Sequence, residues 1–297
     1  MTRFSGTGTA LITPFRNGEV DYGSLERIIA FQIEGGVDFL VVLGTTGEAP
    51  AVTMREREEI VRFAVRTAGG RVPVVVGTGS NSTVTALELA RQAVSSGADG
   101  LLVVTPYYNK PPQEGLYEHF KKVASGTGGA PLIIYNVPGR TGVNILPETV
   151  MRLAEIENIA GIKEASGDQA QVDVLIRRVR NERPDFAVLS GNDDQAFHVT
   201  CAGGDGVISV LSNAAPDKVS DMIRHCLAGR LDKARELHLL LFPLMKGLFC
   251  ETNPIPAKYA ASRLGLCANE VRLPLVPASA KAMETVERAM KESGILL

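Results

Sequence analysis

Eight short apolar runs alternate with stretches of helical periodicity over roughly the first 215 residues, and this alternation limits the possible folds more than any other feature. Most runs are nearly continuous in β-branched and other apolar residues, as in parallel strands covered on both faces. Eight strands alternating with helices favour a TIM (β/α)8 barrel over a doubly wound sheet. The runs are GTALITPF (8–15), DFLVVLGTT (38–46), VPVVVGTGS (72–80), GLLVVTPYY (100–108), PLIIYNVP (131–138), IAGIKEAS (159–166), FAVLSGND (186–193) and GVISVLSN (206–213).

Three of the joints between a helix and the next strand carry the same turn chemistry. Glycine followed by aspartate precedes a run in GGVDFL (35–40), SGADGLL (96–102) and AGGDGVI (202–208). Glycine caps a helix well because it adopts the left-handed conformation without strain. After about residue 215 only helical periodicity remains. The sequence therefore predicts a barrel domain over residues 1–225 and a C-terminal helical domain over residues 226–297.

Composition argues against several classes of partner. The chain of 297 residues has a formal net charge of −2 and no basic stripe, so a nucleic-acid partner is not expected. No uninterrupted apolar run reaches the roughly 18 residues of a membrane span, and the start lacks the long apolar core of a secretory signal. The four cysteines form no C-x-x-C pair, which suits a reducing compartment. We expect a cytoplasmic protein that binds no membrane.

No metal or cofactor is expected either. The four histidines fall in predicted helices with no shared spacing, whereas metal-dependent aldol chemistry needs histidines and carboxylates clustered at strand ends. The phosphate-binding pattern G-x-x-x-x-G-K-[ST] does not occur, and GTGS (77–80) is too short a match to a dinucleotide-binding loop. The chemistry must then come from the side chains at the carboxyl ends of the strands, where TIM barrels place their active sites.

Lys163 ends an apolar run in AGIKEASGD (160–168), which is an unusual place for a charged residue. One explanation is structural: the side chain could extend out of the strand and pair with a carboxylate. The other is catalytic. Desolvation in the mouth of a barrel would lower the lysine pKa from about 10.4, and the neutral amine is a nucleophile that forms a Schiff base with a carbonyl compound.

Other side chains at the same end of the barrel complete a possible site. Tyr135 lies one strand away at matching height and could carry the protons of carbinolamine dehydration and enamine formation. Thr45 and Thr46 could relay protons or bind a carboxylate, and Arg140 has a planar fork that suits a carboxylate. Each alone has a structural explanation: a core tyrosine, a loop that binds its own backbone, a solvated arginine. Their joint placement favours the catalytic interpretation.

Five motifs in these regions resemble the dihydrodipicolinate synthase family, within the pyruvate-dependent class I aldolases that also contain N-acetylneuraminate lyase. The resemblance covers essentially the whole chain and implies a TIM barrel with a C-terminal helical domain and no cofactor. It implies an enzyme that condenses pyruvate with L-aspartate 4-semialdehyde in lysine and diaminopimelate biosynthesis. The motifs are GTTGE (44–48), TPYYNKP (105–111), YNVPGRTG (135–142), GIKEASGD (161–168) and NPIPAK (253–258).

The resemblance also assigns catalytic roles and an assembly. Lys163 would form the Schiff base, and Tyr135 would be the general acid and base. Thr45 would join Tyr135 in a proton relay with Tyr108, which in the family reaches in from a neighbouring subunit. A tyrosine from a partner implies at least a homodimer, and the family commonly forms a tetramer that is a dimer of dimers.

Substrate contacts follow from the same resemblance. Thr46 and the backbone at Ile208 would hold pyruvate, and Arg140 would bind the carboxylate of aspartate semialdehyde. Gly191, at the end of the seventh predicted strand, is also expected to contact substrate.

Two alternatives stay open at this point. Relatives that act on keto-deoxy sugar acids or N-acetylneuraminate share the lysine and the tyrosine, although Arg140 and the Thr45–Thr46 pair favour the synthase. A non-catalytic barrel that only binds a keto acid is the alternative from another class, and it would tolerate replacement of Lys163.

One departure from the family pattern concerns feedback inhibition by lysine. Family members that lysine inhibits bind it with two histidines and a glutamate, among other groups. Met54 and Arg57 stand in the histidine places here, and Thr85 stands in the glutamate place, although Asn81 and Tyr107 match. Because no carboxylate remains to pair with the lysine ammonium, we expect weak or absent feedback.

Overall fold

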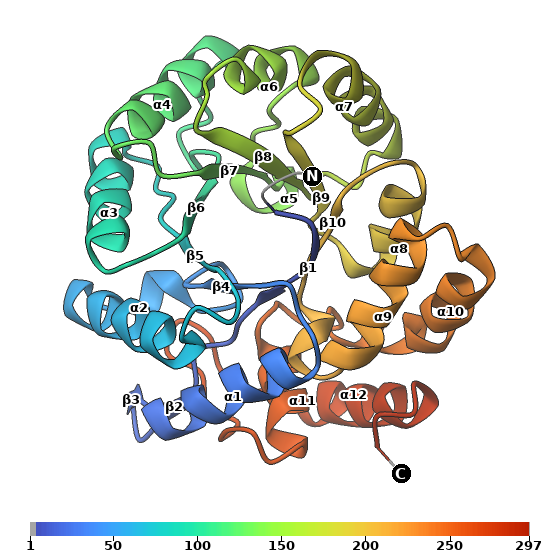
Figure 1. The fold of residues 1–297 in the computed structure, drawn as a ribbon. Helices are drawn as coiled ribbons and strands as arrows, with labels where there is room; N and C mark the ends of the chain where they lie inside the picture. Colours follow the sequence, from blue (N-terminus) through green and yellow to red (C-terminus); the bar gives the residue numbers. More distant parts are fainter. Residues whose placement is uncertain (1–3, 297) are drawn as a thin grey trace.

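The eight predicted strands close into a parallel barrel in the order β1-β10-β9-β8-β7-β6-β5-β4 in the computed structural model, which describes residues 4–296 (Figure 1). Each strand lies within a predicted run except β1, which begins two residues before its run, so the predicted TIM barrel is confirmed. The strands are β1 Gly6–Ala10, β4 Phe39–Val42, β5 Val74–Gly77, β6 Gly100–Val104, β7 Leu132–Asn136, β8 Ile159–Glu164, β9 Ala187–Ser190 and β10 Gly206–Ser209.

Eight helices, one after each barrel strand, form the outer ring (Figure 1). They are α1 Tyr22–Glu34, α2 Met54–Ala68, α3 Thr83–Ser95, α4 Gln113–Ser125, α6 Pro147–Ala154, α7 Gln169–Glu182, α8 Asp193–Cys201 and α9 Pro216–Leu227. Short elements that the sequence did not indicate interrupt this pattern. They are the hairpin β2 Phe15–Arg16 and β3 Glu19–Val20, the 3-10 turns η1 Ala49–Ala51 and η2 Leu211–Asn213, and the short helix α5 Pro138–Thr141.

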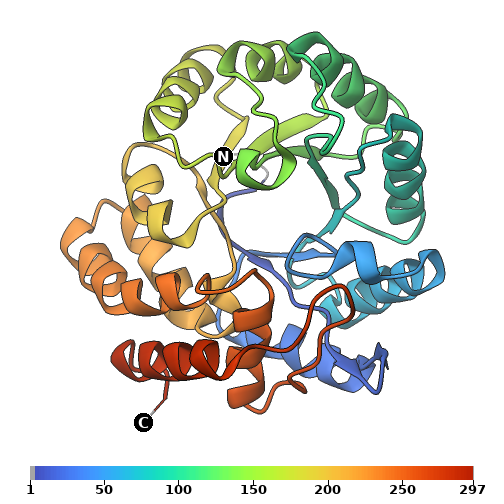
Figure 2. The same ribbon diagram turned by 180° about the vertical axis from the view of Figure 1, so that it is seen from behind.

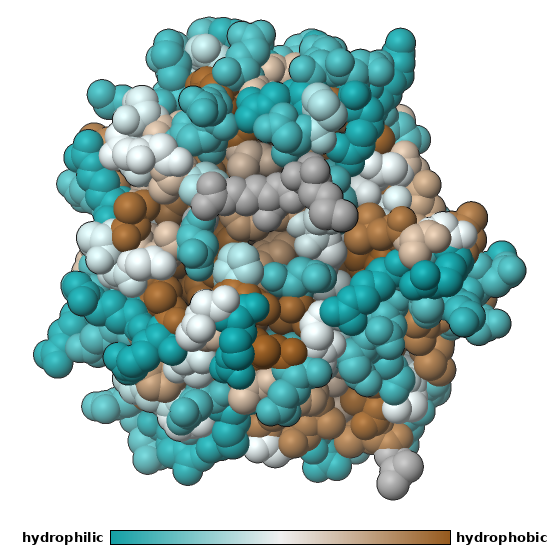
Figure 3. All heavy atoms as spheres, viewed as in Figure 1, coloured by the Kyte–Doolittle hydropathy of each residue, from teal (hydrophilic) through white to brown (hydrophobic). Residues whose placement is uncertain are grey.

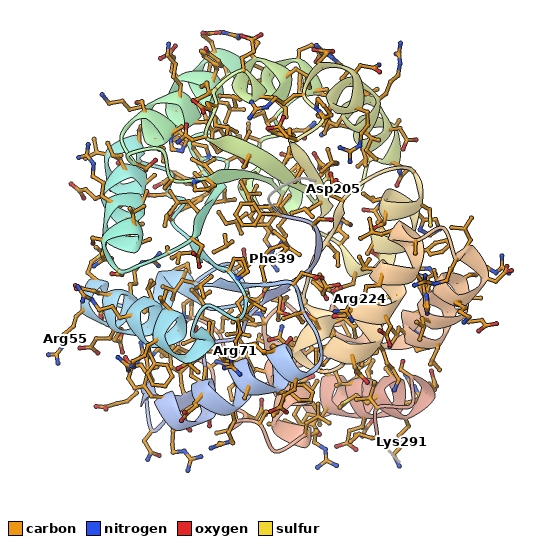
Figure 4. The ribbon with its side chains drawn as sticks, in the orientation of Figure 1. Phe39, Arg55, Arg71, Asp205, Arg224 and Lys291 are labelled. Carbon is orange, nitrogen blue, oxygen red and sulfur yellow. The ribbon has the colours of Figure 1, made fainter. Side chains whose placement is uncertain are left out.

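Helix α2 shows how the sequence sets the ends and faces of these helices. Thr53 and Glu56 form a reciprocal capping box at its start, and Gly69 ends it in the left-handed conformation at φ +58°. Ile60 and other apolar residues at helical spacing face the barrel and are buried. Arg55 points outward from the opposite face (Figure 4). The same division leaves much of the surface in Figure 3 hydrophilic, with apolar patches between the helices.

The barrel interior is a packed core rather than a pore. Phe39, only 1% exposed, lies inside the ring of strands (Figure 4) and packs against Phe4 with their ring centroids 5.7 Å apart. A Cβ atom at Gly8 would lie 2.2 Å from the Phe39 ring, so only glycine leaves room for this phenylalanine. The opposite, carboxyl end of the barrel is thus where an open site can form.

The C-terminal helices pack on one side of the barrel, beside α8, α9 and the N-terminal hairpin (Figures 1 and 2). They are α10 Leu231–Gly247, α11 Ile255–Arg263 and α12 Ala280–Glu292. Glu270 and Arg272, between α11 and α12, bond the backbone of the hairpin tip at Asn17 and Gly18. The predicted domain boundary at residue 225 falls in the last turn of α9, and the division into two domains stays a prediction.

Within residues 4–296, no helix is both long enough and apolar enough to cross a membrane.

Candidate active site

Lys163 and Tyr135 meet at the carboxyl end of the barrel. They are partners in the register between β8 and β7, so their side chains lie at the same height. The Lys163 Nζ atom lies 4.4 Å from the centroid of the Tyr135 ring. Both residues are buried, with 5% and 7% of their surface exposed. The structure therefore brings together the two groups on which the expected chemistry depends most.

Burial governs the protonation of Lys163. Desolvation lowers the pKa of its ammonium from 10.5 to about 8, because the charged form loses its hydration. The carboxylate of Asp193 opposes this shift, and the guanidinium of Arg140 adds to it. No carboxylate lies within 4.0 Å of the Lys163 ammonium in residues 4–296, so its charge has no direct counterion. A useful fraction of free amine is thus present near neutral pH.

Asp193 is the carboxylate whose charge raises the pKa of Lys163, but its oxygens already accept hydrogen bonds from other groups. Its two oxygens accept hydrogen bonds from Ser209 Oγ at 2.5 Å and from the backbone N–H groups of Val210 and Leu211 at 2.9 Å each. Burial nevertheless raises the pKa of Asp193, with these bonds and Lys163 opposing the shift. Asp193 stands in the predicted run 186–193, but sequence reasoning gave it no role.

Gly191 lies directly against the lysine side chain. A Cβ atom at this position would come within 3.1 Å of Lys163 Cε and 2.7 Å of Ala165 Cβ. Glycine therefore leaves the room in which the lysine side chain sits. Its expected contact with substrate stays a prediction.

The GTTGE loop (44–48) supplies Thr45 to this group. Burial raises the pKa of the Tyr135 phenol, and the guanidinium of Arg140 and the nearby Thr45 hydroxyl oppose that shift. Two tight turns shape the loop, from Gly47 N to Gly44 O and from Glu48 N to Thr45 O, each 3.1 Å long. Glu48 adopts a left-handed backbone with φ +52°, which is uncommon for a residue with a side chain.

Thr46 and Arg140 are linked through one residue of the C-terminal helical region. Asn253 donates a hydrogen bond from Nδ2 to Thr46 Oγ1 at 3.0 Å. Its backbone carbonyl accepts a bond from Arg140 Nη2 at 3.3 Å. Thr46 is buried, whereas Arg140 is exposed. The motif NPIPAK contains Asn253, yet sequence reasoning did not assign it to the site.

A cavity of about 540 Å³ opens beside these groups. Thr45, Tyr135 and Arg140 are among the residues that line it. The residues expected to weaken lysine feedback line the same cavity, namely Met54, Arg57 and Thr85, together with Tyr107. Arg57 adds a cation to the cavity wall, although burial lowers its pKa to about 10, and the Glu48 carboxylate that also lines the cavity is already paired with Lys258.

Two predicted site residues lie differently. Ile208, in β10, has a fully buried side chain, so only its backbone is a candidate contact. Tyr108 follows β6 with φ +71°, and its side chain is 88% exposed. A single chain therefore does not bring Tyr108 into the group around Lys163. Within residues 4–296, no cluster of three or more His, Cys, Asp or Glu side chains could hold a metal ion.

The profile of the Dihydrodipicolinate synthetase family matches residues 3–293. The chain belongs to this family. Its relatives include the 4-hydroxy-tetrahydrodipicolinate synthase of Kosmotoga olearia, 59% identical with 99% of each chain covered. The synthase of Thermotoga neapolitana is 54% identical, with 99% of this chain and 100% of the relative covered.

Solved structures agree with this membership of the dihydrodipicolinate synthetase family. The dihydrodipicolinate synthase of Thermotoga maritima superposes with a TM-score of 0.97 at 52% identity, covering 99% of each chain. A monomeric dihydrodipicolinate synthase variant gives the same TM-score and identity, covering 99% of this chain and 98% of the variant. The family, the fold and the enzyme class expected from the sequence are therefore confirmed, and the relatives' names agree with the expected synthase activity.

Proposed function

We propose that this protein is a 4-hydroxy-tetrahydrodipicolinate synthase that condenses pyruvate with L-aspartate 4-semialdehyde through a Schiff base on Lys163. The observation that carries the proposal is the buried Lys163 amine, which has a pKa of about 8, lies 4.4 Å from the Tyr135 ring and has no carboxylate in direct contact within residues 4–296. The names of the full-length relatives support the identity of both substrates.

Lys163 supplies the nucleophile in this mechanism. Its free amine adds to the C2 carbonyl of pyruvate, and the carbinolamine loses water to give the protonated Schiff base. Loss of a proton from the methyl carbon gives the enamine, whose carbon attacks the aldehyde carbon of aspartate semialdehyde. Burial favours the sequence because it keeps part of the lysine neutral before pyruvate arrives.

Tyr135 moves the protons of these steps. Its phenol gives a proton to the departing hydroxyl of the carbinolamine and exchanges protons with the nearby Thr45 hydroxyl. Tyr108 of a second subunit extends this relay to solvent, which would explain why its side chain is 88% exposed in one chain. The substrate contacts are the hydroxyl of Thr46 and the backbone at Ile208 and Gly191 for pyruvate, with Arg140 for the carboxylate of the aldehyde.

This relay requires at least a homodimer, and we expect a tetramer built as a dimer of dimers. Exposed apolar side chains beside the cavity support a contact there: Met54 is 51% exposed, Val84 67% and Tyr107 39%. Sedimentation of the purified protein measures the assembly. If the protein is fully active as a monomer, Tyr108 of a second subunit does not take part in the relay.

The product enters lysine and diaminopimelate biosynthesis, which places the enzyme in the cytoplasm. We also propose weak feedback by lysine, because Thr85 lines the cavity in the place of the glutamate that would pair with the lysine ammonium. A lysine titration of the assay should leave most activity at millimolar lysine. Strong inhibition at sub-millimolar lysine would contradict this.

The experiment that tests the proposed reaction offers pyruvate with aspartate semialdehyde and, separately, with aldehydes of sugar acids and with N-acetylmannosamine. A coupled assay measures kcat/KM for each aldehyde. The proposal expects aspartate semialdehyde to be preferred, because Arg140 gives its carboxylate a partner. A higher kcat/KM for a sugar-derived aldehyde would assign the chain to another activity of the aldolase superfamily.

A further inference from the structure

One segment of the C-terminal helical region, Asn253–Lys258, contacts the GTTGE loop at two points. The Asn253 amide bonds Thr46, and the Lys258 ammonium pairs with the Glu48 carboxylate. These contacts join residues 207 and 210 positions apart in the sequence. The loop that carries Thr45 and Thr46 is therefore held from outside the barrel as well as by its own turns.

The direction of the Asn253–Thr46 bond has a chemical consequence. A hydroxyl has one hydrogen to donate and lone pairs that accept. Because Asn253 Nδ2 donates to Thr46 Oγ1, that bond uses a lone pair and leaves the Thr46 hydrogen free for another acceptor. A carboxylate is an acceptor only, so the bond orients Thr46 in the one way that helps it bind the carboxylate of a keto acid.

Asn253 acts on a second binding group through its backbone. Its carbonyl accepts from Arg140 Nη2 at 3.3 Å, which restrains the guanidinium and leaves its other N–H groups available. The same residue thus contacts the group proposed for pyruvate and the group proposed for the carboxylate of the aldehyde. No other residue from 4 to 296 donates to Thr46 Oγ1 and accepts from Arg140.

The position of Asn253 is well fixed. It is 5% exposed, and Lys258 follows it in the first turns of α11. Lys258 and the backbone N–H of Arg272 both bind Glu48, the latter at 3.0 Å. A left-handed backbone at a residue with a side chain, such as Glu48, is strained and persists only where its surroundings hold it in place. The contacts of Lys258 and of the Arg272 backbone with the Glu48 carboxylate hold the residue in this conformation.

We propose that Asn253 is a positioning residue for both substrates: its amide orients the Thr46 hydroxyl as a donor, and its carbonyl restrains Arg140. The inference rests on the proposed function, because it needs pyruvate to bind through Thr46. It adds that a residue outside the barrel sets the affinity of the site.

The test is a double-mutant cycle on pyruvate binding. Asn253→Leu keeps the branching of the side chain but cannot donate, and it is made in the wild-type and Thr46→Val backgrounds. A hydrogen bond to a charged group contributes enough for Asn253→Leu to raise the KM for pyruvate about tenfold in the wild type. In the Thr46→Val background the hydroxyl is already gone, so the increase should be less than about twofold. The kcat should change less than the KM for pyruvate.

Thr252→Val is the matched control, because Thr252 precedes Asn253 and lines the same cavity. It should leave the KM for pyruvate within about twofold of wild type. If Asn253→Leu does not fold, as judged by circular dichroism and thermal unfolding, Asn253→Ala replaces it, since it lacks the same donor.

The outcomes separate this inference from the proposed function. Equal increases of the KM for pyruvate in the two backgrounds would overturn the inference, because the residue would not act through Thr46. Failure of the wild type to form a borohydride-trapped adduct with pyruvate would overturn the proposed function, and the inference with it.

Discussion

Two buried lysines in this protein have opposite environments. Lys163 is 5% exposed with no carboxylate in direct contact among the described residues, whereas Lys258 is fully buried and paired with the Glu48 carboxylate. Both lie over aromatic rings, of Tyr135 at 4.4 Å and of Phe15 at 4.2 Å. Burial and aromatic contact are therefore shared, and the counterion is the difference. Burial lowers the pKa of both lysines, but only at Lys258 does a carboxylate in direct contact oppose the shift and occupy the ammonium group.

The difference also predicts which lysine stabilises the fold. The charge of Lys258 is balanced by Glu48, so this pair joins α11 to the GTTGE loop. The charge of Lys163 is balanced poorly, so the folded state carries an electrostatic cost at its active site. Active sites commonly reduce stability in this way, in exchange for activity.

The largest effect should come from Lys163→Met. We expect turnover to fall to background, because no other group can form the Schiff base. Unfolding stability at pH 7 should rise by about 1–3 kcal/mol, because the lysine pKa is lower in the folded than in the unfolded chain and removing the charge removes that cost. The cost is present below the folded pKa of about 8 and disappears above the unfolded value of 10.5. The gain should therefore shrink from pH 8 to 10.5, as urea unfolding measures.

Lys258→Met should lower the free energy of unfolding, whereas Lys163→Met should raise it. It leaves the Glu48 charge buried without a partner, which costs about 3–5 kcal/mol of unfolding free energy. The double variant Glu48→Gln/Lys258→Met removes both charges and should recover most of that loss. Urea unfolding of the three proteins measures this. If Lys163→Met and Lys258→Met changed the free energy of unfolding in the same direction, the inferred difference between the two lysine environments would be contradicted.

Tyr135→Phe removes the hydroxyl and keeps the ring beside Lys163. Turnover should slow by a factor on the order of 100, the usual effect of losing a general acid and base. Because the ring still shields the amine, a Schiff base with pyruvate should still form, although slowly. Steady-state kinetics check the first expectation and trapping with borohydride checks the second. If kcat is unchanged, Tyr135 is not the general acid and base of the reaction.

The smallest expected change, for a step of one pH unit, is a pH dependence. The rate of pyruvate capture should rise about tenfold per pH unit below pH 8 and level off above it, because only the neutral Lys163 amine reacts and burial lowers its pKa to about 8. Rapid-mixing kinetics from pH 6 to 10 measure this profile. A midpoint near the ordinary lysine value of 10.5 would mean that the amine is solvated.

The parts of the site that could be predicted from sequence are those set by the strands. Apolar runs gave the eight strands, and placing Lys163 and Tyr135 at the ends of adjacent runs implied their contact, since parallel strands end at one edge. Asn253 and Lys258 could not be placed in this way. Their partners, Thr46 and Glu48, lie more than 200 positions away, and such a contact leaves no local pattern.

The placement of Tyr108 and the influence of Asp193 could not be predicted from the sequence for other reasons. The role expected of Tyr108 depends on a second chain, so neither the sequence pattern nor one chain's structure can place it. Asp193 was visible at a strand end, but its influence on Lys163 depends on three donors from residues 209–211 that occupy its oxygens. A sequence shows which carboxylates are near a site, but not which of them are free to act as counterions.

The most direct test of the central claim compares the two lysines in one experiment. The protein is incubated with isotopically labelled pyruvate, reduced with borohydride and digested, and the peptides that carry Lys163 and Lys258 are examined by mass spectrometry. We predict that the reduced three-carbon adduct forms on Lys163 alone and is absent from Lys163→Met. An adduct on another residue, or no adduct at all, would contradict the account.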